Sequence, residues 1–411
     1  MRRSFTRLNH KVTAVLLATA ATLGAASGAR ASDHIDSPAT VADPQTDIGD
    51  IYAWTASDGR KLNLAMTIVG HSFSSRLRYE FHVDSGAGFG RTSATTLITC
   101  RFPEPKVVRC NVGSADVAEG DAGDPSGLVS HGGHFKVFAG LRDDPFYNNV
   151  KGSLAAYGVV AAAVKAGAPV DKAGCVSLDP PTVEAVRDQF QHTDGGPPQN
   201  LLANWTASAI VLSLDLNLVN KGGPLLAIWG STASPVRQLD RMARPFVGNT
   251  LLGDAPFSGD APSGALRQAY NAGTPANSAG DAAEMERSLA LHDALDGVCG
   301  NQVLADHAPD PAHRYQPLAQ VFADDRLWVN SAAHVCTQFF AVELAALAGR
   351  EAYRSDCGGR SPVYATPNTW RSLLVMGRVE GFSDGLQRDE HAPSADTFPF
   401  LAPPDPQGVN H

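Results

Sequence analysis

Period-two alternation of apolar and polar residues is the feature that most narrows the folds open to this chain. Isoleucine or leucine occupies every second position from Ile210 to Leu218, and residues 61–68 and 77–83 alternate in the same way. Because successive side chains of a strand point to opposite faces of a sheet, these stretches predict strands with one face in a core. The second face of 210–219 is itself partly apolar, which predicts a central place in the sheet.

Shorter patterns complete the predicted fold. Further strands are predicted at 94–102, 106–112, 134–140 and 225–230. Helices are predicted at 153–167, at 179–190, and along two runs of apolar residues spaced three or four apart, 285–295 and 335–346. The chain is therefore predicted to be mainly β with helical insertions, an α+β fold. Its core is expected to be an antiparallel β-sandwich, with the helices in the C-terminal half.

Residues 1–31 have the composition of an export signal. A basic stretch ending at Lys11 precedes an apolar stretch at 12–26, and Ala29-Arg30-Ala31 fits a cleavage site. The arginines at positions 2 and 3 also fit a twin-arginine signal in part, so that route and the general secretory route both stay open. We expect an exported protein, periplasmic or extracellular, with no membrane span after signal cleavage.

The rest of the chain is predicted to form one domain over residues 32–404, β-rich over 32–255 and helix-richer over 256–404, with an extended tail at 405–411. Five of the 33 basic residues lie in the signal and all 42 acidic residues follow it, so the remainder carries a formal net charge of −14. An acidic chain without a basic cluster argues against nucleic acid or an anionic membrane as partner. The expected partner is an unidentified small molecule or a component of the cell envelope.

All six cysteines lie after the signal, where an oxidising compartment favours disulfides. Cys100 and Cys110 flank a turn-bearing segment, so a hairpin would bring them together, and we predict that bridge. The other cysteines allow three pairings, and the sequence does not choose among them: Cys175, Cys299, Cys336 and Cys357. No Cys/His spacing typical of a zinc site is present.

The segment 32–54 is rich in acids and contains no Lys or Arg. Carboxylates a few residues apart in a loop suit calcium, whereas an imidazole suits zinc, iron or copper, so the predicted divalent cation is calcium, or a transition metal if His34 is a ligand. The alternative is that these aspartates only form turns and helix caps. The candidate metal ligands in this segment are His34, Asp36, Asp43, Asp47 and Asp50.

A second acidic group follows the predicted strand 134–140. Asp143 and Asp144 are adjacent and precede Pro145, so we predict that they bind metal together with the opening segment. Arg142 is predicted to pair with one of them or to fix the turn, which is the alternative interpretation of the group. A last acidic group lies near the C-terminus and is interpreted either as a calcium-compatible site or as a solvated loop. It comprises Asp384, Asp389, Glu390 and Asp396.

Signatures of common catalytic schemes are absent from the sequence. It contains no G-x-S-x-G elbow, no H-E-x-x-H, no P-loop and no G-x-G-x-x-G after a predicted strand. The catalytic residues are therefore unknown, and the chain is more readily interpreted as a non-enzymatic protein.

Several sequence blocks resemble an uncharacterised bacterial family, number 4331 among the domains of unknown function. The two most specific blocks are S-D-H-I-D-S-P with D-I-G-D-I-Y-A-W in 32–54, and V-F-A-G-L-R-D-D-P-F at 137–146. Weaker matches lie at 227–232, 240–250 and 398–404. The resemblance spans nearly all of 32–404 and implies an exported, β-rich envelope protein, but it implies no activity. The chain departs from the family pattern at 384–390, which weakens a calcium interpretation of that loop.

Two functional hypotheses lead. The first is a non-enzymatic binding or structural module in which a cation fastens the N-terminal segment to the β-core. The second is a metal-dependent hydrolase or oxidoreductase that uses the region of His34, Asp36, Asp143 and Asp144. A purely structural module without an ion is the third.

Overall fold

Two antiparallel β-sheets form the centre of the molecule. The computed structural model describes residues 37–252, 257 and 264–405. The first sheet has five strands in the order β1-β2-β9-β8-β7. Their bounds are β1 Ile48–Thr55, β2 Lys61–Ile68, β9 Thr206–Asp215, β8 Phe135–Asp143 and β7 Leu128–Val129. The most strongly alternating stretch of the sequence thus forms the central strand β9, as predicted. The stretch stops short of Val219 because Leu216–Leu218 turns into a 3-10 helix.

The second sheet has seven strands in the order β11-β10-β3-β4-β5-β6, with β12 also paired to β10. Their bounds are β11 Gln238–Met242, β10 Leu225–Ala233, β3 Arg78–Gly86, β4 Ala94–Glu104, β5 Val107–Val112, β6 Asp116–Asp121 and β12 Leu327–Asn330. The predicted strands at 94–102, 106–112 and 225–230 are therefore confirmed as β4, β5 and β10.

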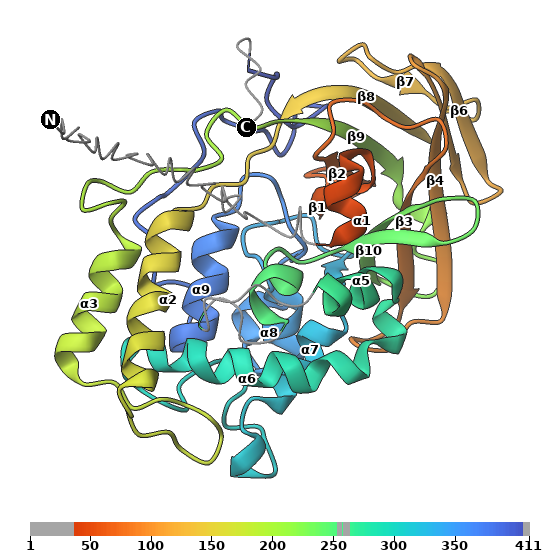
Figure 1. The fold of residues 1–411 in the computed structure, drawn as a ribbon. Coiled ribbons are helices and arrows are strands. Elements are labelled where there is room, and N and C mark those ends of the chain that lie inside the picture. Colours follow the sequence, from red (N-terminus) through yellow and green to blue (C-terminus); the bar gives the residue numbers. More distant parts are fainter. Residues whose placement is uncertain (1–36, 253–256, 258–263, 406–411) are drawn as a thin grey trace, which may run out of the picture.

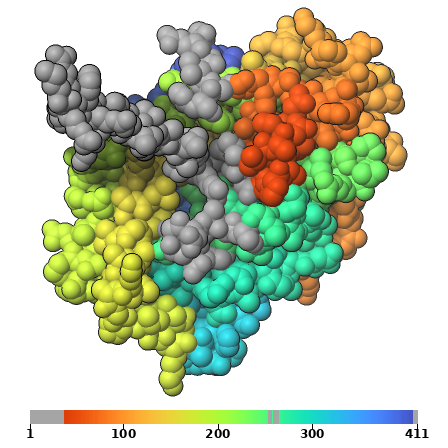
Figure 2. All heavy atoms as spheres, viewed as in Figure 1, coloured from red at the N-terminus to blue at the C-terminus, as the bar shows by residue number. Residues whose placement is uncertain are grey.

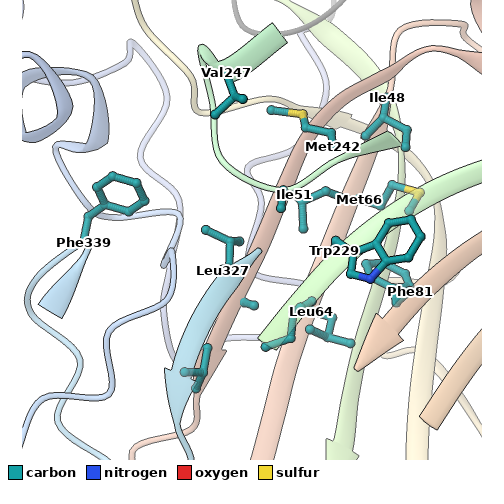
Figure 3. Packing of buried hydrophobic residues seen from close by; sticks show 14 of the residues in the cluster. Ile48, Ile51, Leu64, Met66, Phe81, Trp229, Met242, Val247, Leu327 and Phe339 are labelled. Carbon is teal, nitrogen blue, oxygen red and sulfur yellow. The ribbon is translucent and has the colours of Figure 1, made fainter. Parts of the chain in front are cut away.

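The main core fills the space between the two sheets. Alternate residues of β2 and β9 point inward, and those of β3 meet them from the other sheet. Figure 3 shows Ile51, Leu64 and Met66 of the first sheet gathered near Phe81 and Trp229 of the second. The residues that alternate with them on β1 and β9 point to the outer face of the first sheet and form a second apolar layer there. The strands thus bury both faces, and the predicted sandwich-like core is confirmed.

The helices gather mostly in the C-terminal half and on one side of the sheets, with α2, α3 and α9 side by side (Figure 1). The α-helices among the described residues are α1 Pro38–Ala42, α2 Val150–Lys165, α3 Pro180–Phe190, α5 Gly264–Ala272, α6 Ala282–Asp293, α7 Gln316–Ala323, α8 Ala341–Leu347 and α9 Thr366–Met376. None of them is long and apolar enough to cross a lipid bilayer.

Capping explains where the predicted helices begin. Helix α3 starts as predicted, because Asp179 accepts a hydrogen bond from the Thr182 N–H and proline occupies the first position. Helix α2 starts three residues earlier than predicted, because its N-cap is Asn149 rather than Ser153. The side chain of Asn149 accepts a hydrogen bond from the N–H of Gly152.

The run at 335–346 is helical only in its second half. Val335 instead forms a bridge with Asp356, and the neighbouring Cys336 is bonded to Cys357. Phe340 then takes a left-handed conformation, with φ of 69°, just before α8. Tertiary pairing therefore overrides the helical spacing over 335–340.

The N-terminal segment is more regular than the loop that its composition suggests. Ser37 caps α1 in a capping box with Thr40, and α1 lies on the surface beside α5 (Figure 2). After a short 3-10 turn at Pro44–Thr46, the chain enters β1, all eight residues of which are buried. The described C-terminal segment 377–405 contains no helix or strand, and the predicted tail at 405–411 lies almost wholly outside the described residues.

Three disulfides join the six cysteines. Cys100–Cys110 links β4 to β5 across the hairpin and confirms the predicted bridge. The pairings that the sequence left open are Cys175–Cys299 and Cys336–Cys357. Such bridges are consistent with an exported protein.

Candidate metal centre

The candidate site lies at the C-terminal end of β8. The N–H of Asp143 donates to the carbonyl of Ala402 at 3.1 Å, and the N–H of Asp144 donates to the carbonyl of Trp205 at 3.0 Å. Pro145 follows and has no N–H to continue the ladder, so the strand stops here. Because adjacent side chains in a strand point to opposite faces, the two carboxylates enter different surroundings.

Asp143 meets two residues of the C-terminal segment, Asp389 and His391. One ligand atom from each of the three lies within 4.8 Å of the other two. Nδ1 of His391 is 3.2 Å from Oδ1 of Asp143, while Oδ2 of Asp143 is buried and has no hydrogen-bond partner. Asp143 is 1% exposed and Asp389 is 7% exposed. It is the only group of three or more potential metal-ligating side chains within the described ranges.

Burial makes negative charge costly in this group. Burial and, after it, the nearby carboxyls of Glu390 and Asp143 together raise the pKa of Asp389 to about 10. Burial likewise raises the pKa of Asp143, although hydrogen bonds with Asp389 and His391 oppose that change. Two buried carboxyl groups in contact therefore retain a proton or require a positive ion between them.

Asn200 holds the C-terminal segment in this position. Its Nδ2 donates to Asp389 at 3.0 Å and to Glu390 at 3.1 Å. Its Oδ1 accepts the backbone N–H groups of Asn148 and Leu202, both at 3.1 Å, which fixes the orientation of the amide. Such outer contacts orient metal-ligating carboxylates in known metal sites.

The donor set fits a metal ion. Two ligands bound next to each other at about 2.1 Å from an ion lie about 3.0–3.4 Å apart, for octahedral or tetrahedral geometry. The 3.2 Å between Asp143 and His391 falls in that range. One imidazole and two carboxylates suit Zn²⁺, Mn²⁺ or Fe²⁺, whereas calcium prefers oxygen ligands throughout. The group of Asp143, Asp389 and His391 could therefore hold a metal.

Asp144 faces the opposite side and is saturated by protein donors. It accepts hydrogen bonds from the hydroxyl of Tyr52 at 2.7 Å and from Thr67. Nearby, Asp50 forms a buried ion pair with Arg360, whose guanidinium lies 4.2 Å from the centre of the Tyr52 ring. Burial raises the pKa of Asp144, but these contacts leave it without an open oxygen for a metal.

Comparisons with protein-family models, with curated proteins and with solved structures find no match.

The resemblance to the uncharacterised family therefore stays a prediction.

The structure brings some of the predicted ligands together. Asp50 and Asp144 both line a small cavity of about 10 Å³ with Phe146, Leu202 and Trp205, enough for about one water molecule.

The other predicted ligands lie apart from this cavity. Asp43 caps the 3-10 turn by accepting the N–H of Gln45 at 3.2 Å. Asp47 is fully buried, and its carbonyl accepts the N–H of Val69. His34 and Asp36 lie outside the residues that the structure describes.

The structure differs from the prediction at Arg142. This side chain forms no ion pair with Asp143 or Asp144, or with any other described carboxylate. Its guanidinium instead lies 4.3 Å from the centre of the Phe138 ring, four residues earlier on the same face of β8. The alternation of the strand explains this, because Asp143 points to the other face.

His391 was not among the predicted ligands, and Asp389 was predicted only as part of an acidic loop. His391 is 248 residues from Asp143, and no spacing motif joins the two. The one available signal was that D-E-H at 389–391 combines carboxylates with an imidazole near the end of the chain.

Proposed function

We propose that this chain is an exported binding or structural protein in which a divalent cation fastens the C-terminal segment to the end of β8. Asp143, Asp389 and His391 would be the ligands. The three disulfides support export, because such bonds persist in oxidising compartments. The proposal keeps the predicted cation and the predicted role of Asp143, but assigns the fastened segment to the C-terminal part of the chain.

The observation that carries this proposal is the unpartnered Oδ2 of Asp143 beside a second buried carboxyl. A buried carboxylate oxygen normally accepts hydrogen bonds from the protein, as both carboxylate groups around Tyr52 do. Oδ2 of Asp143 accepts none from an N–H or hydroxyl group of the described chain, and the carboxyl of Asp389, in contact with Asp143, can donate only while it keeps a proton. A divalent cation would use that oxygen and neutralise both carboxylates.

The fastened segment covers a large apolar surface. Beyond His391, the carbonyl of Ala395 accepts the indole N–H of Trp54 at 3.0 Å, and the ring of Phe400 packs edge-on against that indole. Before the site, Asp384 pairs with Arg371 of α9 at 3.0 Å. A cation at Asp389 and His391 would thus join two anchor points of a segment that has no regular structure of its own.

Elemental analysis of the purified protein, combined with thermal unfolding with and without a chelator, tests this proposal. We expect one equivalent of zinc, manganese or iron per chain and a lower Tm after chelation. His391→Ala should remove the metal and the chelator effect together, whereas His307→Ala, which changes an exposed histidine elsewhere, should remove neither. Metal-free protein with a chelator-independent Tm would refute the proposal.

One observation favours the alternative of a metal-dependent hydrolase. The side chain of His391 is 37% exposed, so one side of the group faces solvent and leaves room for a bound water. This alternative uses Asp143 but not Asp144, which is saturated by Tyr52 and Thr67. Hydrolysis of activated esters or phosphodiesters that depends on added metal and disappears in His391→Ala would support it.

A further inference from the structure

A cleft of about 1030 Å³ opens beside β8, and its lining includes none of the three candidate metal ligands. Its floor is formed by β8 and β9, including Leu141 and Ser208, and its walls come from three connections of the second sheet and its neighbours. These are the β2–β3 loop, the β4–β5 turn and the β6–β7 loop. The volume is at the upper end of the range for small-molecule pockets, so the cleft has room for a segment of several residues.

The edge of β8 is unpaired where it borders this cleft. On this edge the N–H of Ala139 donates to the carbonyl of Ala122 at 2.9 Å, and the N–H of Asp143 donates to that of Ala402. The backbone groups of successive strand residues point to alternate edges. Leu141 lies midway between Ala139 and Asp143, so its N–H and C=O point to the same edge as theirs. Strand β7 pairs only with Val137 and Lys136, so no described strand reaches Leu141, which is 41% exposed.

The rim of the cleft is acidic. Glu104 is the last residue of β4, Asp121 is the last residue of β6, and Asp124 lies on the β6–β7 loop. All three are exposed, and none forms an ion pair with a described residue. Lys106 is the only Lys or Arg among the lining residues. The rim therefore attracts positive charge and repels anions.

Part of the cleft wall is aromatic. The ring of Phe73 is stacked on that of Phe102, with centroids 4.0 Å apart and planes within 7°. Both residues line the cleft, and Phe73 is only partly buried. An aromatic surface accommodates the aliphatic stem of a lysine or the plane of an arginine.

We propose that this cleft binds an extended, positively charged peptide segment of a partner protein, which pairs with the free edge of β8 at Leu141. Strand addition of this kind takes its affinity from main-chain hydrogen bonds and its specificity from the side chains around the edge. Here Leu141 offers one donor and one acceptor, and the acidic rim and the aromatic wall select for Lys or Arg. This proposal is independent of the cation at Asp143.

Fluorescence anisotropy with labelled peptides and the mature protein tests the proposal. The probes are a seven-residue peptide of alternating Lys and Thr, the same peptide with Glu in place of Lys, and the Lys peptide with an N-methyl group on its central residue. We expect the Lys peptide to bind at least tenfold more tightly than the Glu peptide in 50 mM salt. N-methylation should weaken binding about fivefold or more, the effect of losing one hydrogen bond.

Substitutions in the rim locate the binding. The triple variant Glu104→Gln, Asp121→Asn and Asp124→Asn should weaken binding of the Lys peptide about threefold or more, and less so in 300 mM salt. These amides keep the side-chain oxygens that accept the N–H groups of Gly123 and Ser126. The matched control removes three exposed carboxylates outside the cleft, through Glu184→Gln, Asp306→Asn and Asp396→Asn.

Several results would overturn the proposal. They are the absence of binding by the Lys peptide, equal binding of the Lys and Glu peptides, insensitivity to N-methylation, and equal losses in the rim variant and its control. Displacement of the Lys peptide by a neutral oligosaccharide at lower concentration would also overturn it, because the cleft would then be a glycan site.

Discussion

Replacing Asp389 by asparagine distinguishes a cation site from a structural hydrogen bond, because the two predict opposite changes in stability. In the metal-free protein, burial raises the pKa of Asp389 from 3.8 to about 10, so the folded chain keeps a proton at pH 7 that the unfolded chain has lost. Each pH unit above 3.8 therefore lowers the free energy of unfolding by about 1.4 kcal/mol, which amounts to about 4 kcal/mol at pH 7. Asparagine carries no such cost and keeps an oxygen and a similar shape.

The sign of the pH dependence follows from the raised pKa. Between about pH 4 and pH 10 the folded metal-free protein binds more protons than the unfolded chain, so its free energy of unfolding falls as the pH rises. Asp389→Asn should remove most of this slope. In a chelator at pH 7 the variant should therefore be more stable than the parent protein, by up to about 4 kcal/mol, and the difference should shrink toward pH 5.

Added cation should offset this difference. At a concentration of 1,000 times its dissociation constant, a cation that binds only the folded state stabilises the parent protein by about 4.1 kcal/mol, enough to cancel a deficit of about 4 kcal/mol, and the variant, which lacks a charged ligand, should gain much less. Urea unfolding at pH 5, 7 and 8, with chelator or with Zn²⁺, measures both effects. Asp396→Asn, an exposed position in the same segment, is the control. The reasoning would be refuted if the Asp389→Asn variant were less stable than the parent protein by the same amount in chelator and in Zn²⁺.

Three further outcomes are expected elsewhere in the fold. Arg360→Met should lower the free energy of unfolding by about 3–5 kcal/mol, since it strands the buried carboxylate of Asp50; adding Asp50→Asn should restore most of that loss in urea unfolding. Burial lowers the pKa of His292 from 6.5 to about 4. The unfolded chain therefore binds a proton that the folded chain does not, and acidification over that window should cost up to about 3 kcal/mol, a slope that His292→Gln should flatten in pH-dependent unfolding. Joint replacement of Cys175 and Cys299 by serine should cost about 4–5 kcal/mol in thermal unfolding, because the bridge closes a loop of 124 residues, and a loss below about 1 kcal/mol would contradict the chain-entropy argument.

The strands of the core were predictable because their signal is local. Alternation at 61–68 and 210–219 follows from one buried face, and these stretches form β2 and most of β9. Strand β1 was not predicted, since both of its faces are buried and D-I-G-D-I-Y-A-W shows no alternation of polar and apolar residues. Its Asp50 is tolerated in the core only because Arg360, 310 residues away, neutralises it.

The candidate site was predictable only in part, for a related reason. Adjacent carboxylates at the end of a predicted strand drew attention to Asp143 and Asp144, and the structure indeed buries both. Their partners could not be predicted, because Asp389 and His391 lie on a segment whose path depends on tertiary contacts rather than on a periodic pattern. Arg142 shows the same limit, since its neighbours in sequence do not reveal that Phe138 is its partner.

The pleat of β8 gives Asp143 and Asp144 different chemical roles. Asp144 turns toward Tyr52 and Thr67, which satisfy it with hydroxyl donors from strands of the same sheet. Asp143 turns toward a segment that arrives from the other end of the chain and brings a further carboxyl and the imidazole of His391, but no N–H or hydroxyl donor for Oδ2. A carboxylate that the protein saturates can serve as a structural link without an ion. The neighbouring one is equally buried but unsaturated, and it is the group to which our proposal assigns the cation.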